Sequence, residues 1–330
     1  MIVGLLKHRV QVSIFTISIV YFGLIAYSLV IPSSFYAISD VPENLLFGPI
    51  FGKIILNSLL YKIITFAFIL IGAVTLTVVS VNHELISKTN LLPAFFYCVF
   101  SFSAVTSVAL LPILISNAFV ILGLNSLYNS YRRENALFEC FNAGICISLA
   151  SCFYTYYFLI IPIGIIAIMI LKSFNWREWM CFIFGTIMPI YIYSSVSYVK
   201  GLYYSKPFDL FISIFHNSHL PLFSEYYLLF IGVTLFMLVL ALFHYISKGF
   251  GNRVKIQKAK FILIWLSVFC LIISFISSVP NFWLLPCIVP FSIMIGDYLG
   301  EVKRLKIANT LLTLFMGGFL IIWMYHLSLI

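Results

Sequence analysis

Apolar runs of about 20 residues follow one another along almost the whole chain, and a run of that length is what an α-helix needs to cross a bilayer. Of the 330 residues, 63% are hydrophobic and only 9% are charged, whereas about 25% of the residues in a soluble domain are charged. No polar segment is long enough to form a separate soluble domain. The sequence therefore predicts a single integral membrane domain over residues 1–330.

The fold class that follows is an all-α, polytopic transmembrane helix bundle, because lipid offers backbone polar groups no partner outside a helix or a closed barrel. About eleven spans are expected, in a range of about ten to twelve. Their ranges are 11–31, 54–81, 92–112, 114–130, 136–152, 155–171, 178–198, 225–246, 261–279, 282–299 and 307–327. The first is expected to be a retained span, because it is too long for a signal peptide and no small-residue cleavage site follows it.

The short runs between residues 92 and 171 fit only if some helices are short or bent. Pro112 with Asn117, and the run Tyr154–Thr155–Tyr156, are the expected turning points. Small residues in the run SFSAVTSVA (101–109) favour close approach of neighbouring helices there.

Basic residues give the chain an orientation. Counted loop by loop, fifteen of the 19 Lys and Arg residues fall on the side of the N-terminus, three fall on the other side, and Lys62 lies within the second span. The fifteen are Lys7, Arg9, Lys88, Arg132, Arg133, Lys172, Arg177, Lys248, Arg253, Lys255, Lys258, Lys260, Lys303, Arg304 and Lys306; the three are Lys53, Lys200 and Lys206. Because basic loops are retained in the cytoplasm, we expect a bacterial inner-membrane protein with a cytoplasmic N-terminus.

Three loops follow from this arrangement. Residues 32–53 form the first outer loop. Residues 199–224 form a second outer loop, where Asp209 and His216 recur at helical spacing among aromatic residues, as in an interfacial amphipathic helix. Residues 247–260 form a basic cytoplasmic loop that is expected to contact anionic head groups.

Several polar residues have structural interpretations. Asn175 is expected to cap a helix, with Glu178 completing a capping box. Asp297, at the inner end of its span, is expected to pair with a base of the following segment EVKRLK. Lys62 is close enough to the outer end of its span to extend its ammonium group to the interface. The seven cysteines are expected to be small buried hydrophobic residues.

Motifs of common enzyme classes are absent from the sequence, including HExxH, GxxxxGK[ST], GxSxG and DxD. No cofactor is expected. A divalent metal has no support, because His216 and His219 have no assured third ligand. No clustered basic face of the kind that binds nucleic acid is evident.

The outer face carries the residues that could perform chemistry. Asp40 or Glu43 could act as a general base toward an acceptor hydroxyl, and lysines could neutralise a phosphate leaving group. The candidate phosphate- or lipid-binding residues are Lys53, Lys62, Lys200 and Lys206, and the candidate polar residues of the second outer loop are Asp209, His216 and His219.

Two stretches resemble the GT-C membrane glycosyltransferases, which use polyprenyl-phosphate sugars. The first is the outer-loop segment SDVPE (39–43). The second is 125–193, where a basic turn YRR precedes a small-residue span, FLIIP follows, and a further span opens with WRE. The resemblance implies that Asp40 holds the position of the catalytic acid, with Glu43 as the fallback, and that a polyprenyl-phosphate carrier is the partner lipid. More closely, the whole chain resembles an uncharacterised family of Bacteroidota inner-membrane proteins that share the FNWREW entry (174–179).

The expected function is therefore the handling of polyprenyl-phosphate-linked sugars at the outer face of the inner membrane. Two alternatives stay open. The chain could be a non-catalytic subunit of an envelope assembly or secretion complex, with other membrane proteins as partners, or a transporter of lipids or small molecules. Membrane lipids are expected partners in every case.

Overall fold

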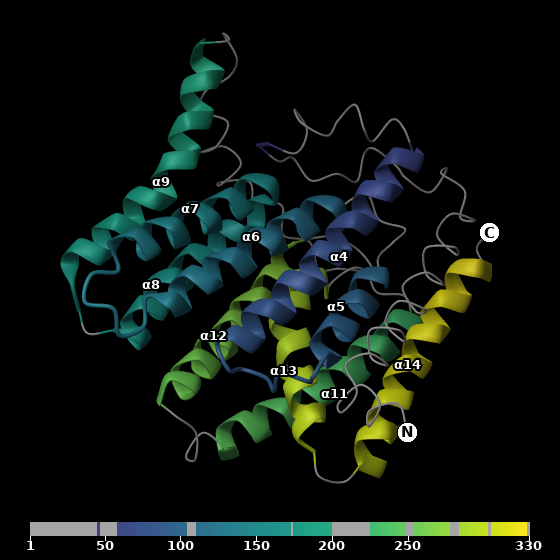
Figure 1. Ribbon diagram of the computed structural model, residues 1–330. Coiled ribbons are helices and arrows are strands. Elements are labelled where there is room, and N and C mark those ends of the chain that lie inside the picture. The colour runs from purple at the N-terminus through teal and green to yellow at the C-terminus, as the bar shows by residue number, and fades with distance from the viewer. Residues whose placement is uncertain are drawn as a thin grey trace.

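The structure, a computed structural model, describes residues 45–46, 58–103, 110–172, 174–199, 225–248, 254–277, 284–302 and 305–328. These residues form helices, without a strand among them (Figure 1). The elements are α4 (Ser58–Asn82), α5 (Leu92–Phe102), α6 (Leu110–Asn129), α7 (Leu137–Phe153), η3 (Thr155–Ile160), α8 (Ile161–Leu171), α9 (Trp176–Val199), α11 (Glu225–Lys248), α12 (Val254–Ile276), η5 (Leu285–Cys287), α13 (Ile288–Glu301) and α14 (Leu305–Ser328). The predicted all-α fold class is confirmed.

Five of the described helices are long and apolar enough to cross a membrane. They are Leu60–Asn82, Leu110–Asn129, Trp176–Val199, Tyr227–Ser247 and Val254–Ile276. The other apolar stretches found by the same search are Leu92–Phe102, Leu137–Phe153, Thr155–Leu171 and Lys306–Ile321, the last of which is part of the longer helix α14. The predicted first span, 11–31, lies outside the described residues.

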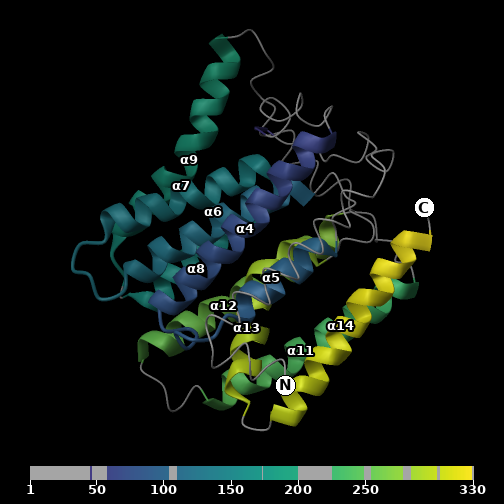
Figure 2. The ribbon, with the colours of Figure 1, turned by 45° about the vertical axis from the view of Figure 1, so that its right-hand side comes forward.

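The centre of the bundle is occupied by two short helices, α5 and α13, which pack against each other and are surrounded by longer helices (Figure 2). All residues of α5 are buried. Asn90, just before α5, donates a hydrogen bond from Nδ2 to the carbonyl of Gly296 in α13 (3.0 Å) and accepts one at Oδ1 from the N–H of Leu92 (3.0 Å). One buried amide thus accepts from the first N–H of α5 and ties the helix to α13.

Helices α7 and α9 cross with their backbones in contact. A Cβ atom placed on Gly144 would stand 2.4 Å from the carbonyl oxygen of Phe182, and one on Gly185 would stand 2.4 Å from that of Phe141. Glycine at both positions is what lets these helices approach so closely. Beyond Pro189, the C-terminal half of α9 extends past the other described helices in both views (Figures 1 and 2).

The two 3₁₀ turns, η3 and η5, meet at a buried amide of α6. The hydroxyl of Tyr157 donates to Oδ1 of Asn117 (2.6 Å), and Nδ2 of Asn117 donates to the carbonyl of Leu285 (3.4 Å). The turn predicted at Tyr154 is confirmed, because α7 ends at Phe153 and Tyr154 is extended. The turn predicted at Pro112 and Asn117 is wrong: α6 passes through both, since a proline in the first turn removes no helical hydrogen bond.

Other sequence predictions are corrected at element ends. The predicted span 92–112 is interrupted, because α5 ends at Phe102 and α6 begins at Leu110. Helix α12 begins at Val254, within the predicted basic loop.

Asn175 caps α9 as predicted, accepting a hydrogen bond from the N–H of Arg177 (3.3 Å). Glu178 does not complete a capping box: its Oε1 accepts from Lys172 (2.5 Å) and from the N–H of Ala136 (3.2 Å). The seven cysteines are free, and five of them are buried.

Candidate functional site: a basic aromatic pocket

Of the residues predicted for chemistry, only Lys62 lies in the described part of the chain. It occupies the second turn of α4 and is 7% exposed. The others, Asp40, Glu43, Lys53, Lys200, Lys206, Asp209, His216 and His219, lie outside the described residues. Their proximity to Lys62 and to one another therefore stays a prediction.

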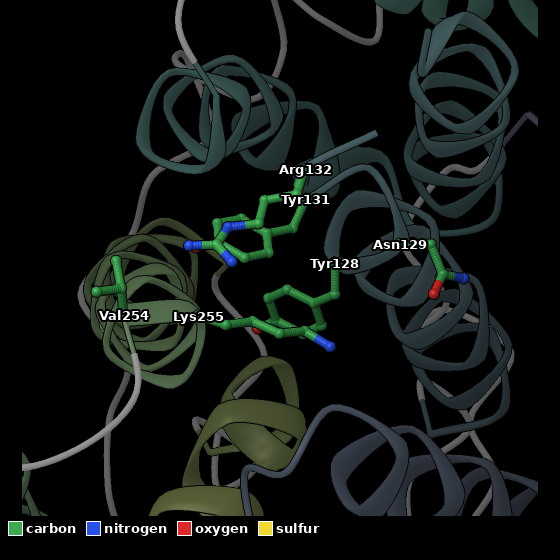
Figure 3. A pocket seen from close by; sticks show the side chains of 6 residues that line it. All are labelled: Tyr128, Asn129, Tyr131, Arg132, Val254 and Lys255. Atoms are coloured by element: carbon green, nitrogen blue, oxygen red, sulfur yellow. The ribbon is translucent and has the colours of Figure 1, made fainter. Parts of the chain in front are cut away.

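A pocket of about 600 Å³ lies where the C-terminal end of α6 meets the first turn of α12 (Figure 3). Its lining residues are Tyr128, Asn129, Tyr131, Arg132, Val254 and Lys255. In the close-up, Arg132 and Tyr131 lie on one side, Tyr128 lies on the other, and Lys255 extends from α12 toward Tyr128. Two helices that are each long enough to cross a membrane thus end at this pocket.

The positive charge of the pocket is not neutralised within the described structure. Neither Arg132 nor Lys255 forms an ion pair with a described carboxylate, whereas the neighbouring Arg133 pairs with Glu139. Among the described residues, the two side chains therefore give the pocket an uncompensated positive charge.

Tyr131 is held between cations. The guanidinium carbon of Arg132 lies 5.4 Å from the centroid of its ring, and the ammonium nitrogen of Lys258 lies 5.5 Å from it. Both distances are within the range of a cation–π contact. Lys258 also donates a hydrogen bond to the carbonyl of Leu171 at the end of α8 (3.1 Å). Tyr131 is thereby fixed at the junction of α6, α8 and α12.

The backbone places Arg132 at the pocket. Its φ of 59° lies in the left-handed region, just past the end of α6, where a helix commonly terminates. An arginine in this conformation is less favourable than a glycine. The turn therefore presents the guanidinium at the expense of local backbone strain.

A buried histidine stands behind the pocket wall. The ring of His83 packs on that of Tyr128 at a centroid distance of 5.1 Å, and its Nε2 is 2.9 Å from Oδ1 of Asn125. Burial lowers the pKa of His83, the hydrogen bond to Asn125 opposes this, and the charge of Lys255 lowers the pKa further. The pKa of His83 is therefore set chiefly by burial, and the charge of Lys255 in the pocket contributes to it.

Next to the pocket, a buried ion pair joins two helices. The ammonium of Lys260 in α12 donates to Oδ2 of Asp297 in α13 (2.7 Å) and lies 4.4 Å from the centroid of the Tyr245 ring in α11. The side chains of Lys260 and Asp297 are 7% and 3% exposed. The partner of Asp297 among the described residues is therefore Lys260 of α12 and not a base of the following segment; Lys303 and Arg304 lie outside the described residues, so pairing with them stays a prediction. Tyr128 donates to the carbonyl of Ala259 (3.4 Å), which links the pair to the pocket wall.

Sequence reasoning missed the pocket because its residues come from two distant segments, NSLYNSYRR (125–133) and RVKIQKAK (253–260). Each segment mixes basic residues with apolar or aromatic ones, which is the signal that was available. No cluster of three metal-binding side chains is present among the described residues. The pocket is therefore a cationic, aromatic site whose chemistry suits an anion.

A family of unknown function (DUF6427) matches residues 44–330 of the chain. No curated protein and no solved structure matches it.

Proposed function

We propose that the chain, which belongs to the family of unknown function DUF6427, is a polytopic membrane protein that binds a phosphate-bearing membrane lipid by its head group in the α6–α12 pocket. The observation that carries this proposal is the presence of Arg132 and Lys255 in one pocket without a carboxylate partner among the described residues. Cations of this kind favour an anion that accepts charge-assisted hydrogen bonds.

The position of the pocket favours a lipid over other anions. It lies at the ends of α6 and α12, and the ends of membrane-crossing helices stand at the level of the lipid head groups. Tyrosine is enriched at that level, because its ring is apolar and its hydroxyl is polar. Tyr128 and Tyr131 would therefore contact the glycerol and upper chain region while the cations hold the phosphate.

Lipid retention tests the proposal. The protein would be extracted in a neutral detergent, and bound phospholipid would be counted by native mass spectrometry. Replacement of Arg132 by Gly removes the guanidinium and suits the left-handed backbone, and Lys255→Met keeps the length of the side chain. A hydrogen bond to a charged group contributes about 1.5–3 kcal/mol, so each variant is expected to bind anionic lipid at least about tenfold more weakly.

Arg133→Ala is the matched control, since it removes one positive charge from the adjacent residue, which pairs with Glu139 and does not line the pocket. It is expected to retain lipid as the wild type does. Equal retention by Arg132→Gly, Lys255→Met and Arg133→Ala would refute the proposal.

The topology we propose has about eleven spans in a bacterial inner membrane, with a cytoplasmic N-terminus. Its support is the alternation of basic loops along the sequence. The pocket would then face the cytoplasmic leaflet. Labelling of single cysteines introduced at Lys88 and Lys206 with a membrane-impermeant reagent tests this, and labelling of Lys88→Cys from outside intact cells would contradict it.

Group transfer from a polyprenyl-phosphate sugar at the opposite face also stays a proposal, supported by the resemblance of SDVPE (39–43) and 125–193 to GT-C enzymes. Asp40 is the expected catalytic base. Asp40→Asn is expected to abolish function in cells while leaving the amount of protein unchanged. Intact function in that variant would remove the transferase proposal.

A third proposal, that of a subunit in a membrane complex, is supported by α9. Few of its residues are buried, and Tyr198 and Val199 at its end are 71% and 84% exposed. This apolar face would be covered by a partner membrane protein. Purification of the functional chain without a stoichiometric partner would contradict this proposal.

A further inference from the structure

We infer that the ligand of the α6–α12 pocket carries a terminal phosphate, as in a lipid phosphomonoester, and not the phosphodiester of an ordinary phospholipid. This inference rests on the proposed function and names its substrate class. It follows from the number and placement of the donors, from the charge of the pocket and from its size.

Three cationic side chains supply donors at the pocket. The guanidinium of Arg132 comes from the turn after α6, the ammonium of Lys255 comes from α12, and the ammonium of Lys258 lies at the edge, against the ring of Tyr131. A phosphomonoester has three terminal oxygens, one for each donor group. A phosphodiester has two, because both remaining oxygens are esterified, so one donor group would be left without an acceptor.

The charge of the pocket leads to the same ligand. Arg132 and Lys255 carry two positive charges without a described carboxylate partner, and Lys258 adds a third at the edge, against Tyr131. A diester carries one negative charge. A monoester carries about 1.5 to 2 near neutral pH, because its second pKa is about 6. Nearby cations favour the second ionisation, so the doubly charged monoester offsets more of this positive charge than a diester does.

The volume of the pocket leaves room for more than a phosphate. About 600 Å³ is the size of a site for a small organic molecule. The cations occupy part of the lining, and the rings of Tyr128 and Tyr131 form another part. These rings would contact the first carbon atoms that follow the ester oxygen, which distinguishes a lipid phosphate from inorganic phosphate.

The test compares two lipids that differ only in the head group. Dioleoyl phosphatidic acid has a terminal phosphate, and dioleoyl phosphatidylglycerol has a diester with the same chains. Each would be titrated against the full chain in a neutral detergent, with native mass spectrometry as the readout. At pH 8 phosphatidic acid is expected to bind about tenfold more tightly, because hydrogen bonds between charged groups are roughly twice as strong as neutral ones and a doubly charged head group forms more of them.

Lowering the pH supplies a second readout. At pH 5, below the second pKa of about 6, the monoester carries one negative charge, and the ratio of the two affinities is expected to fall toward one. Arg132→Gly is expected to reduce the ratio at pH 8, whereas Arg133→Ala is expected to preserve it. A variant that fails to fold is recognised because it binds neither lipid and exposes its buried cysteines to a thiol-reactive dye.

The outcomes separate the two proposals. Equal, Arg132-dependent binding of both lipids would overturn the terminal-phosphate inference and leave the proposed function standing. If the wild type and Arg132→Gly bind each lipid with the same affinity, the proposed function is overturned. If glycerol 3-phosphate competes as strongly as phosphatidic acid, the ligand is a water-soluble phosphomonoester. That result would support the terminal phosphate and refute the claim that the ligand is a lipid.

Discussion

Adding one methyl group at Gly185 is expected to force α7 and α9 apart. The new Cβ would stand 2.4 Å from the carbonyl oxygen of Phe141 and 3.2 Å from the N–H nitrogen of Ile145. Both atoms belong to the backbone, so no rotation of a side chain relieves the contact. Ordinary contact begins at 3.4 Å, so one helix must move by about 1 Å.

The magnitude follows from the rigidity of both partners. Overpacking of a close-packed interior costs about 1–3 kcal/mol, and a contact between two backbones belongs near the upper end, at about 2–3 kcal/mol. One kcal/mol shifts the melting temperature of a chain of this size by about 2 °C. Gly185→Ala is therefore expected to melt about 4–6 °C below its control, and Gly144→Ala is expected to behave alike.

The controls are Gly232→Ala and Gly317→Ala. A Cβ at either position would meet nothing within 4 Å. Both positions are helical, so all of these variants gain the stability of up to about 1 kcal/mol that alanine brings to a helix. The difference in melting temperature between variant and control therefore reports only the steric effect at the α7–α9 crossing. The double variant Gly144→Ala/Gly185→Ala is expected to lose less than the sum of its parts, since the first methyl already separates the helices.

Thermal unfolding in detergent can be followed with a dye that fluoresces on reaction with thiols, because the chain has seven free cysteines and five are buried. The dye reports the temperature at which the interior opens. A melting temperature of Gly185→Ala equal to that of Gly232→Ala would refute the backbone crossing, and the close approach of α7 and α9 would have to be abandoned.

Three other perturbations address the polar interior. Lys260→Met is expected to cost about 3–5 kcal/mol of unfolding free energy, because it leaves Asp297 buried and unpaired. The double variant Lys260→Met/Asp297→Leu is expected to recover most of this loss. Thermal melts of both variants check this, and an equal loss of stability in the two would contradict it. Burial lowers the pKa of His83 in the folded chain, so unfolding takes up a proton below about pH 6.5. The stability contributed by the neutral ring is therefore present above that pH and lost as the pH falls. The melting temperatures at pH 8 and pH 5 should differ less for His83→Gln than for the wild type. Tyr157→Phe removes the donor to Asn117 and is expected to cost about 1–3 kcal/mol, which a melting temperature identical to that of the wild type would disprove.

The helices could be predicted because, in a membrane protein, an apolar run of about 20 residues forms an α-helix that crosses the bilayer. Residues 58–82, 137–153 and 225–248 form helices close to the predicted spans, and Tyr154 marks a turn as expected. The residues at which the helices begin and end were less predictable. Pro112 lies in the first turn of α6, where it is tolerated, and the sequence by itself does not distinguish that position from a helix break.

The polar contacts could not be predicted, because they depend on how each helix is rotated about its own axis. Asp297 is followed by three nearby bases, yet its partner among the described residues is Lys260, 37 positions earlier. Likewise, Arg132 and Lys255 are far apart in the sequence and share a pocket only because α6 and α12 end at the same level. An apolar helix has no polar face from which that rotation could be inferred.

Helix α5 sets an order for biosynthesis. It is too short to remain in a bilayer as an independent span, and its partner α13 is made much later. Asn90 and Gly296 are 206 positions apart, and at about 5–20 residues per second the ribosome needs about 10–40 s to make the chain between them. Throughout that interval Asn90 and α5 lack their final partner, and α4, which is made first and packs against α5, is the described helix that can cover it. The contact with α13 forms only after the ninth described α-helix has been made.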